Sequence, residues 1–480
     1  MASNSLAQNA FFNTLYKALT VVFPLVTVSY ASHVLGASGI GNVSSAHNIV
    51  TYFTMFASLG IPTYGVRTIA KARSVNDKKS PSVVFSELLA INSIATILAL
   101  IAYGIFMSIS GSSVLNVIFA SLIVLNFCNI EWVYQGFEEY RYIAIRSLVI
   151  KILSLFLLLI WVRTAEDLWK YTVIVCFGTA GNYILNVFRL RKYVRIQFRG
   201  LSITEHLKPI FVLFASVIAI ELYSLLDVTM LTSMTTSECV GYYSNAVKIV
   251  KMVANTFTAI GAVLLPRLSF YFSNNEQGKI EQTVTNFLKV ILFISIPSCI
   301  GVVLVAEPVV QVLFGNDFAN AIPTLRILSP LMILMPLSGG IFGQLLLTTN
   351  KEKEFLKCVL AGSVGNAILN ALLIPSLAQN GAAIASVCTE ALVTTLMILK
   401  CKNISKLNVD KKHLLGILLA GLSMFVVVSI LNMSITGWSY IIWLLCDIVC
   451  AVCVYGIVLL LMRNDTALSI IDAVKAKIKK

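Results

Sequence analysis

The chain has 480 residues, of which 58% are apolar and only 12% are charged, and its mean hydropathy is +0.87. Soluble domains are about 25% charged, so the composition excludes a soluble enzyme, a disordered chain and a nucleic-acid-binding protein. The formal net charge of +14 suggests a nucleic-acid partner only until the charges are placed. The basic residues lie in short clusters between long apolar stretches, which is typical of a protein that crosses a membrane many times.

Fourteen segments are long and apolar enough to be membrane helices, each of which needs about 20 residues. Residues 1–10 carry no basic group, so we expect the first segment to be retained rather than removed as a signal peptide. In chain order the segments lie near 11–34, 41–65, 83–109, 114–134, 147–163, 170–188, 209–232, 241–265, 284–305, 322–347, 356–375, 380–399, 414–431 and 439–462.

Lysine and arginine concentrate in every second loop, and the opposite loops hold only Arg163 and Lys170. Basic loops stay on the cytoplasmic side, so we expect both termini to be cytoplasmic. The opposite loops, such as Gly36–Ile40 and Ser376–Asn380, are too short for an extramembrane domain. The basic regions lie near 66–82, 135–146, 189–208, 266–283, 348–355 and 400–413 and in the tail from 463.

An offset of 200 residues aligns two parts of the chain. Between residues 25 and 67 it gives eight identities, among them Gly41 with Gly241. Six predicted helices separate the copies, so both copies have the same orientation, which is one of the common plans of membrane transporters. We therefore expect two parallel-repeat six-helix bundles and two additional C-terminal helices.

These repeats define the predicted lobes. We expect an N-terminal lobe over 1–200, a C-terminal lobe over 201–405, and helices 13 and 14 with a basic cytoplasmic tail over 406–480. The basic stretch Arg189–Lys208 would be the linker between the lobes.

Predicted helix 8 carries Ser244, Lys248, Lys251 and Asn255 at spacings that place them on one face. Charges within a bilayer are costly and usually face a water-filled cavity or a partner. We expect this face to line a cavity, with Lys248, Lys251 and Asn255 binding substrate. Pairing of the two lysines with acidic groups of predicted helix 7, Glu221 and Asp227, is the alternative, and the two are compatible.

Predicted helices 1 and 2 carry a similar polar stripe. Lys17 and Asn48 are candidate substrate-binding residues, although Lys17 is near enough to the cytoplasmic end to extend its ammonium to the surface. Pro24 removes a backbone hydrogen bond and should kink the first helix, either as a moving hinge or as a static bend.

Two further candidates lie in the second lobe. Arg326 follows Pro323 and could line the cavity or lie at the outer interface. Glu390, together with Glu221 and Asp227, could bind a coupling ion or pair with a neighbouring charge. We expect Glu87, Lys151 and Lys289 to extend to the cytoplasmic surface.

Nucleotide-hydrolysis and zinc-protease motifs are absent from the sequence, and the cysteines lie mostly within apolar segments. We therefore expect a secondary transporter and not an enzyme, with no resident cofactor or metal and with coupling to H⁺ or Na⁺ left open. Basic groups in a wet cavity attract anionic substrates. The expected mechanism is alternating access through a basic central cavity.

Four stretches resemble the Wzx-type flippases for lipid-linked polysaccharide repeat units. The first is Leu59-Gly-Ile-Pro-Thr-Tyr-Gly-Val-Arg-Thr-Ile-Ala-Lys, and the second is Glu131-Trp-Val-Tyr-Gln-Gly-Phe-Glu-Glu-Tyr-Arg-Tyr-Ile. The third runs from Leu226-Asp227 to Ala246-Val-Lys248, and the fourth from Phe314-Gly to Asn350-Lys-Glu-Lys-Glu. That family belongs to the multidrug/oligosaccharidyl-lipid/polysaccharide (MOP) exporter superfamily, whose two six-helix bundles form a V.

The resemblance implies a flippase of the bacterial cytoplasmic (inner) membrane. It would move oligosaccharide units linked to undecaprenyl pyrophosphate to the outer leaflet for capsule, O-antigen or exopolysaccharide assembly. Membrane lipids, a polysaccharide polymerase and a chain-length regulator are the partners it implies, and a monomer suffices. The alternatives are a cation-coupled multidrug exporter or a peptidoglycan-precursor lipid flippase of the same superfamily.

Overall fold

The computed structural model describes residues 6–73, 79–262, 264–274, 276–349, 351–402, 411–434, 437–464 and 466–468. Within these ranges the chain is helical and contains no strand. Each of the fourteen predicted segments falls largely on helical residues, and the all-α polytopic fold is confirmed. Ten of the described helices are long and apolar enough to cross a membrane, and two of these combine two predicted segments across a kink.

The chain divides into two compact units. The first comprises Met1–Thr232 with Thr236–Gly241, and the second comprises Ser233–Thr235 with Tyr242–Lys480. Most of α8 (Thr204–Met234) therefore belongs to the first unit. The lobe boundary near residue 200 stays a prediction.

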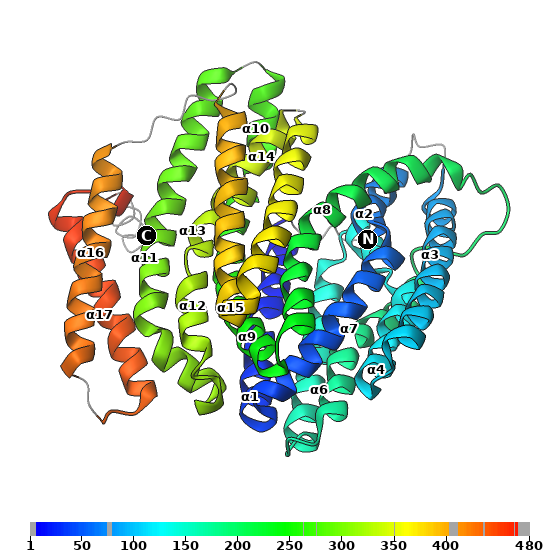
Figure 1. The fold of residues 1–480 in the computed structure, drawn as a ribbon. Coiled ribbons are helices and arrows are strands. Elements are labelled where there is room, and N and C mark those ends of the chain that lie inside the picture. Colours follow the sequence, from blue (N-terminus) through cyan, green and yellow to red (C-terminus); the bar gives the residue numbers. More distant parts are fainter. Residues whose placement is uncertain are drawn as a thin grey trace. The chain divides into compact units, whose positions relative to one another are not determined.

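In the first unit α1 packs against α3, α4, α6 and α7 (Figure 1). A buried core that includes Phe85, Leu88, Trp132 and Val133 joins α2, α3 and α5. The helices of this unit are α1 (Leu6–Ser58), α2 (Ile61–Ala72), α3 (Pro81–Ser110), α4 (Val114–Val124), η1 (Leu125–Cys128), α5 (Glu131–Gly136), α6 (Tyr140–Trp161), α7 (Leu168–Leu190) and α8.

In the second unit α16 and α17 lie side by side and pack on α11 (Figure 1). The Tyr455 hydroxyl of α17 donates to the carbonyl oxygen of Phe293 on α11 at 2.8 Å. The elements of this unit are α9 (Ser237–Ala262, after its first turn), α10 (Leu264–Ser273), α11 (Gln277–Phe314), η2 (Asn316–Phe318), α12 (Ala321–Leu328), α13 (Leu331–Met335), η3 (Pro336–Phe342), α14 (Gly343–Thr348), α15 (Glu352–Cys401), α16 (Lys411–Ser434) and α17 (Tyr440–Leu461).

Two predicted loops are replaced by single-residue kinks. Gly36 (φ 67°) is the non-helical residue inside α1, and Ala378 (φ 46°) is the one inside α15. Positive φ is inexpensive for glycine but costs an alanine on the order of 1 kcal/mol. The sequence predicted short loops at 36–40 and 376–380, and in the structure each is reduced to a kink at one non-helical residue whose flanking residues are helical.

The fourth and fifth predicted spans also differ from the structure. The segment 114–134 is interrupted between α4 and α5, where the Asn126 side chain accepts a hydrogen bond from Ser58 at 3.0 Å and donates one to Thr96 at 3.4 Å. The fifth span begins at Tyr140 and not at 147, so Arg146 lies inside α6 and not in a loop.

The repeat-related glycines meet in the first unit. A Cβ on Gly41 would overlap the carbonyl oxygen of Ser237, and a Cβ on Gly241 would overlap that of Ala37. Each carbonyl lies four residues before the glycine of its own copy, so the contact is the same in both directions. Such self-complementary contact is what a two-fold axis between copies produces, and it supports the duplication inferred from the 200-residue offset.

We expect Gly41→Val to destabilise the protein, because the added side chain must push α9 away from α1. The melting temperature in detergent should fall by several degrees. Gly104→Val is the matched control, since a Cβ there meets no atom within 4 Å. Equal melting temperatures for the two variants would contradict the close contact.

Candidate functional site

A buried ionic cluster lies among α5, α6 and α7. Arg146 forms an ion pair with Glu131, and its Nε donates to the Asn182 side chain at 3.1 Å. Another guanidinium nitrogen of Arg146 donates to the Asn186 side chain. The Arg146 side chain is only 2% exposed, so several partners are needed to offset its loss of water.

The carboxylate of Glu131 receives further hydrogen bonds. The Tyr16 hydroxyl of α1 donates to Oε1 at 3.1 Å, and the Gln135 amide donates to the same oxygen at 3.2 Å. The cluster therefore connects α1 to the α5–α7 bundle. The cluster was not predicted, because the fifth span was expected to begin one residue after Arg146.

Lys151 lies one and a half turns beyond Arg146 on α6. Its ammonium is buried without a hydrogen-bond partner in the described part of the chain, and it faces the Phe23 ring at 5.8 Å. The expectation that Lys151 extends to the surface was wrong, because α6 begins earlier than predicted and carries the residue deeper.

Asn48 lies in the contact between α1 and α8. Its amide donates to the Thr229 hydroxyl at 2.8 Å and to the carbonyl oxygen of Leu225 at 3.2 Å. The Tyr52 hydroxyl reaches the same threonine at 3.0 Å. Asp227 is buried on α8, whereas Glu221 is exposed. Asn48 thus joins two helices, and its contact with substrate stays a prediction.

In the second unit, α9 presents a graded polar face. Lys248 and Asn255 are exposed, Lys251 is half-buried and Ser244 is buried. Within the described part of this unit, Lys248 and Lys251 form no ion pair. Charged side chains of a membrane protein usually face water or a partner, and the exposed Lys248 is consistent with a water-filled environment.

Glu390 is buried on α15 and accepts a hydrogen bond from the Ser338 hydroxyl. Ser338 lies in η3, a π-helical turn that begins at Pro336. Such turns are rare in proteins overall, and those that occur are often found at functional sites. Arg326 on α12 is exposed, and its Nε donates to the carbonyl oxygen of Val303 at 3.2 Å.

Pro24 lies in the part of α1 that precedes the kink at Gly36, and it is exposed. The Thr27 hydroxyl donates to the carbonyl oxygens of Phe23 and Pro24. The side chain of Lys17 lies outside the described residues. The roles of Lys17 and Pro24 stay predictions.

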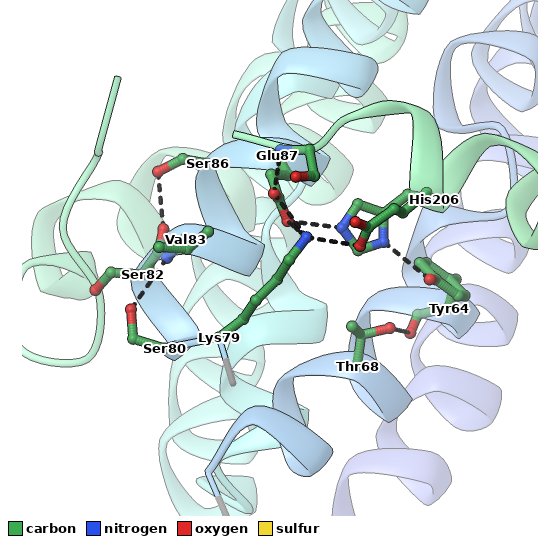
Figure 2. Close-up of polar contacts among 11 residues, drawn as sticks. Tyr64, Thr68, Lys79, Ser80, Ser82, Val83, Ser86, Glu87 and His206 are labelled. Atoms are coloured by element: carbon green, nitrogen blue, oxygen red, sulfur yellow. Dashed lines mark hydrogen bonds and ion pairs between the residues drawn. The ribbon is translucent and has the colours of Figure 1, made fainter. Parts of the chain in front are cut away.

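A second ionic cluster holds the 189–208 segment against the start of α3. Figure 2 shows Glu87 between Lys79 and His206, with the Tyr64 hydroxyl on the far side of the imidazole. The distances from Glu87 are 2.9 Å to the Lys79 ammonium and 2.7 Å to His206 Nε2. An ionised carboxylate can only accept hydrogen bonds, so Nε2 of His206 carries the proton and donates it in a hydrogen bond to Glu87.

Backbone groups of the segment complete this cluster. The amide of Ser202 donates to Glu87 at 2.6 Å, and those of Arg195 and Gln197 donate to the hydroxyls of Ser82 and Ser86. Glu87 is fully buried, so the expectation that it extends to the surface was wrong. The predicted linker is held to the first unit by paired charge.

The ammonium of Lys79 remains charged in this setting. Burial acts to lower the pKa of Lys79, but hydrogen bonds to Glu87 and Glu205 outweigh burial, and the pKa is raised above the ordinary lysine value. Near neutral pH the carboxylate of Glu87 therefore keeps its cationic partner.

The comparisons with known proteins agree with this architecture. The family model described as "Polysaccharide biosynthesis protein" matches residues 6–272, and the model for the lipid II flippase MurJ matches residues 182–450. The chain belongs to the polysaccharide biosynthesis family of Wzx-type flippases, within the MOP exporter superfamily. It is a multi-pass membrane protein and a lipid-linked polysaccharide flippase.

Two relatives cover much of the chain. A candidate O-antigen transporter of Escherichia coli (strain K12) is 26% identical over 83% of this chain and 97% of its own length. The capsular polysaccharide biosynthesis protein CapF of Staphylococcus aureus is 27% identical over 65% of this chain and 81% of its own length.

Solved structures share the fold. A lipid II flippase MurJ in an inward closed conformation has a TM-score of 0.78 at 15% identity, covering 95% of this chain and 99% of its own. An inward-facing MATE family transporter of the MOP superfamily has a TM-score of 0.67 at 16% identity, covering 82% of this chain and 97% of its own.

We expect Arg146→Met to destabilise the flippase strongly, because it leaves the partly buried carboxylate of Glu131 without its cation, a loss of up to about 3–5 kcal/mol. The double variant Glu131→Gln/Arg146→Met should recover part of that loss. Thermal unfolding in detergent measures both, with the exposed Arg199→Met as control. Independent, additive effects of the two substitutions would contradict the ion pair.

Proposed function

We propose that this flippase translocates oligosaccharide units linked to undecaprenyl pyrophosphate from the inner to the outer leaflet of the bacterial cytoplasmic membrane, with both of its termini cytoplasmic. The single observation that carries the proposal is the match to the candidate O-antigen transporter, which extends over 83% of this chain and 97% of that relative. The match to a capsular polysaccharide protein supports the same class of substrate.

The chemistry of the exposed face of α9 suits this substrate. A hydrated sugar and a pyrophosphate cannot enter hydrocarbon, whereas the prenyl chain can remain there. Ammonium groups bind phosphate oxygens, so Lys248 and Lys251 would hold the pyrophosphate, and Asn255 would bind phosphate or sugar hydroxyls. Lys17 and Asn48 of the first unit and Arg326 of the second are further proposed substrate-binding residues, with Glu221, Asp227 and Glu390 as proposed charge partners or coupling groups.

The proposed mechanism is alternating access, with Pro24 as a hinge in α1. No bond is made or broken in the substrate. Polar side chains along the path replace the hydrogen bonds that the head group loses when it leaves water. This lowers the free-energy barrier to moving the head group across the membrane.

Peptidoglycan-precursor transport is a second candidate, favoured by the match of the MurJ model to residues 182–450. The two candidates differ in the sugar carried and in the consequence of loss. Loss of the only peptidoglycan-precursor flippase should kill the cell, whereas loss of a surface-polysaccharide flippase should leave a viable cell.

Deletion of the chain should cause complete repeat units on undecaprenyl pyrophosphate to accumulate while surface polysaccharide disappears, because only translocation is blocked. Mass spectrometry of lipid extracts and a surface-polysaccharide probe measure both. Unchanged lipid intermediates and surface polymer, in a strain without a second flippase, would contradict the proposal. Accumulation of a peptidoglycan precursor would favour the second candidate.

Lys248→Ala should abolish surface polysaccharide without reducing the amount of protein in the membrane, because the pyrophosphate loses a cation. Lys411→Ala, which removes an exposed lysine at the start of α16, is the matched control. Complementation of the deletion strain, with immunoblotting for expression, gives the readout. Normal surface polysaccharide in the Lys248→Ala strain would show that Lys248 is not part of the substrate site.

A further inference from the structure

A cavity of about 340 Å³ lies where α6 begins and α7 ends, in the first unit. Glu139, Arg141, Tyr142, Ile145 and Arg189 line it. The opposite end of α6 carries Trp161, and aromatic residues mark the membrane–water interface. The cavity therefore lies at the other interface, on the side with the basic loops. The residues proposed to bind the transported substrate are not part of its lining.

The charges of the cavity are incompletely paired. Arg189 lies 3.9 Å from the Glu139 carboxylate and 3.4 Å from the Tyr193 hydroxyl. Arg141 forms no ion pair with a carboxylate in the described part of the chain, and its guanidinium faces the Phe12 ring at 5.9 Å. Two guanidinium groups and one carboxylate leave a net charge of about +1.

The cavity wall formed by Tyr142 is held from three sides. The ring lies 4.4 Å from the Arg189 guanidinium and 5.5 Å from that of Arg146. Its hydroxyl donates to the carbonyl oxygen of Leu185 at 2.9 Å. Because Arg146 is itself fixed by the buried ion pair with Glu131, this side of the cavity is formed before any ligand arrives.

An apolar strip continues from the cavity along α6. Its members are spaced by three or four residues, which places them on one helical face, and each is at least 43% exposed. The strip extends over about 15 residues, or roughly 22 Å, which is comparable to a lipid acyl chain. It consists of Ile145, Val149, Ile152, Phe156 and Ile160.

We propose that this cavity binds the head group of an anionic phospholipid from the leaflet that we expect to be cytoplasmic. Its phosphodiester would lie between Arg141 and Arg189, and one acyl chain would follow the α6 strip. Basic pockets between membrane helices on the cytoplasmic side bind such head groups. Glu139 can accept a hydrogen bond from a hydroxyl of the head group, which favours phosphatidylglycerol over a lipid without hydroxyls.

The charge balance favours a phospholipid over the pyrophosphate-linked lipid that the protein is proposed to transport. A phosphodiester carries one negative charge, which matches the net charge of the cavity. A pyrophosphate carries more negative charge than the cavity can neutralise, and the excess negative charge would lie beside the carboxylate of Glu139. The inference does not depend on the proposed flippase substrate.

Native mass spectrometry of the purified full-length protein tests the site. Titration with phosphatidylglycerol should show one molecule bound at least about tenfold more tightly than the next, and phosphatidylcholine should show no such first site. Arg141→Gln should weaken the first site about tenfold, equivalent to roughly 1.4 kcal/mol. The exposed Arg199→Gln in the 189–208 segment is the matched control and should bind as the unmodified protein does.

Arg141→Lys keeps the charge and should retain most of the binding, which separates loss of charge from misfolding. Equal binding of phosphatidylcholine, or an unchanged first site in Arg141→Gln, would overturn the proposal. So would displacement of the bound phosphatidylglycerol by equimolar undecaprenyl pyrophosphate, since the occupant would then be the transported lipid class. Displacement by millimolar inorganic phosphate would show a phosphate site without lipid recognition and would also overturn it.

Discussion

The cost of placing polar groups in hydrocarbon is the constraint on which this structure depends. Every charged side chain within a membrane span must form an ion pair, face water or bind a substrate or ion. Glu131 and Arg146 are paired inside the first unit, and the amides of Asn182 and Asn186 satisfy the rest of the guanidinium. Glu87 is paired with Lys79 and His206 where the 189–208 segment meets α3. Lys248 on α9 is exposed and forms no ion pair within the described part of its unit, so its surroundings must supply water or an anionic ligand. That difference separates structural charges from those proposed to bind substrate.

The glycine contact and the ionic clusters have complementary roles. Gly41 and Gly241 let the backbones of α1 and α9 touch, at positions 200 residues apart that the duplication relates. The Glu87 cluster holds the start of α8 to the rest of the first unit, although the sequence predicts that α8 is the first helix of the second lobe. The first compact unit therefore extends beyond the lobe boundary predicted near residue 200.

Much of the fold follows from the sequence, since the length of the apolar segments determines which parts of the chain form membrane-spanning helices. The kinks at Gly36 and Ala378 did not follow, because a single positive φ can replace a loop without any change in hydropathy. Arg146 was placed in a loop because the predicted fifth span began at 147, and its partner Glu131 lies 15 residues earlier, across the turn between α5 and α6. The Glu87–His206 pair spans 119 residues, and no local pattern predicts such a contact. The polar face of α9 was predictable, because its spacing is a property of one helix.

The most direct test of the account is translocation by the purified protein alone. Proteoliposomes would contain a fluorescent oligosaccharide linked to undecaprenyl pyrophosphate, and a membrane-impermeant quencher would report how much of it becomes accessible. The account predicts faster exchange between leaflets with the unmodified protein than with Lys248→Ala or with protein-free vesicles. Equal rates for the unmodified protein and protein-free vesicles, under an imposed H⁺ or Na⁺ gradient as well as without one, would contradict the central claim.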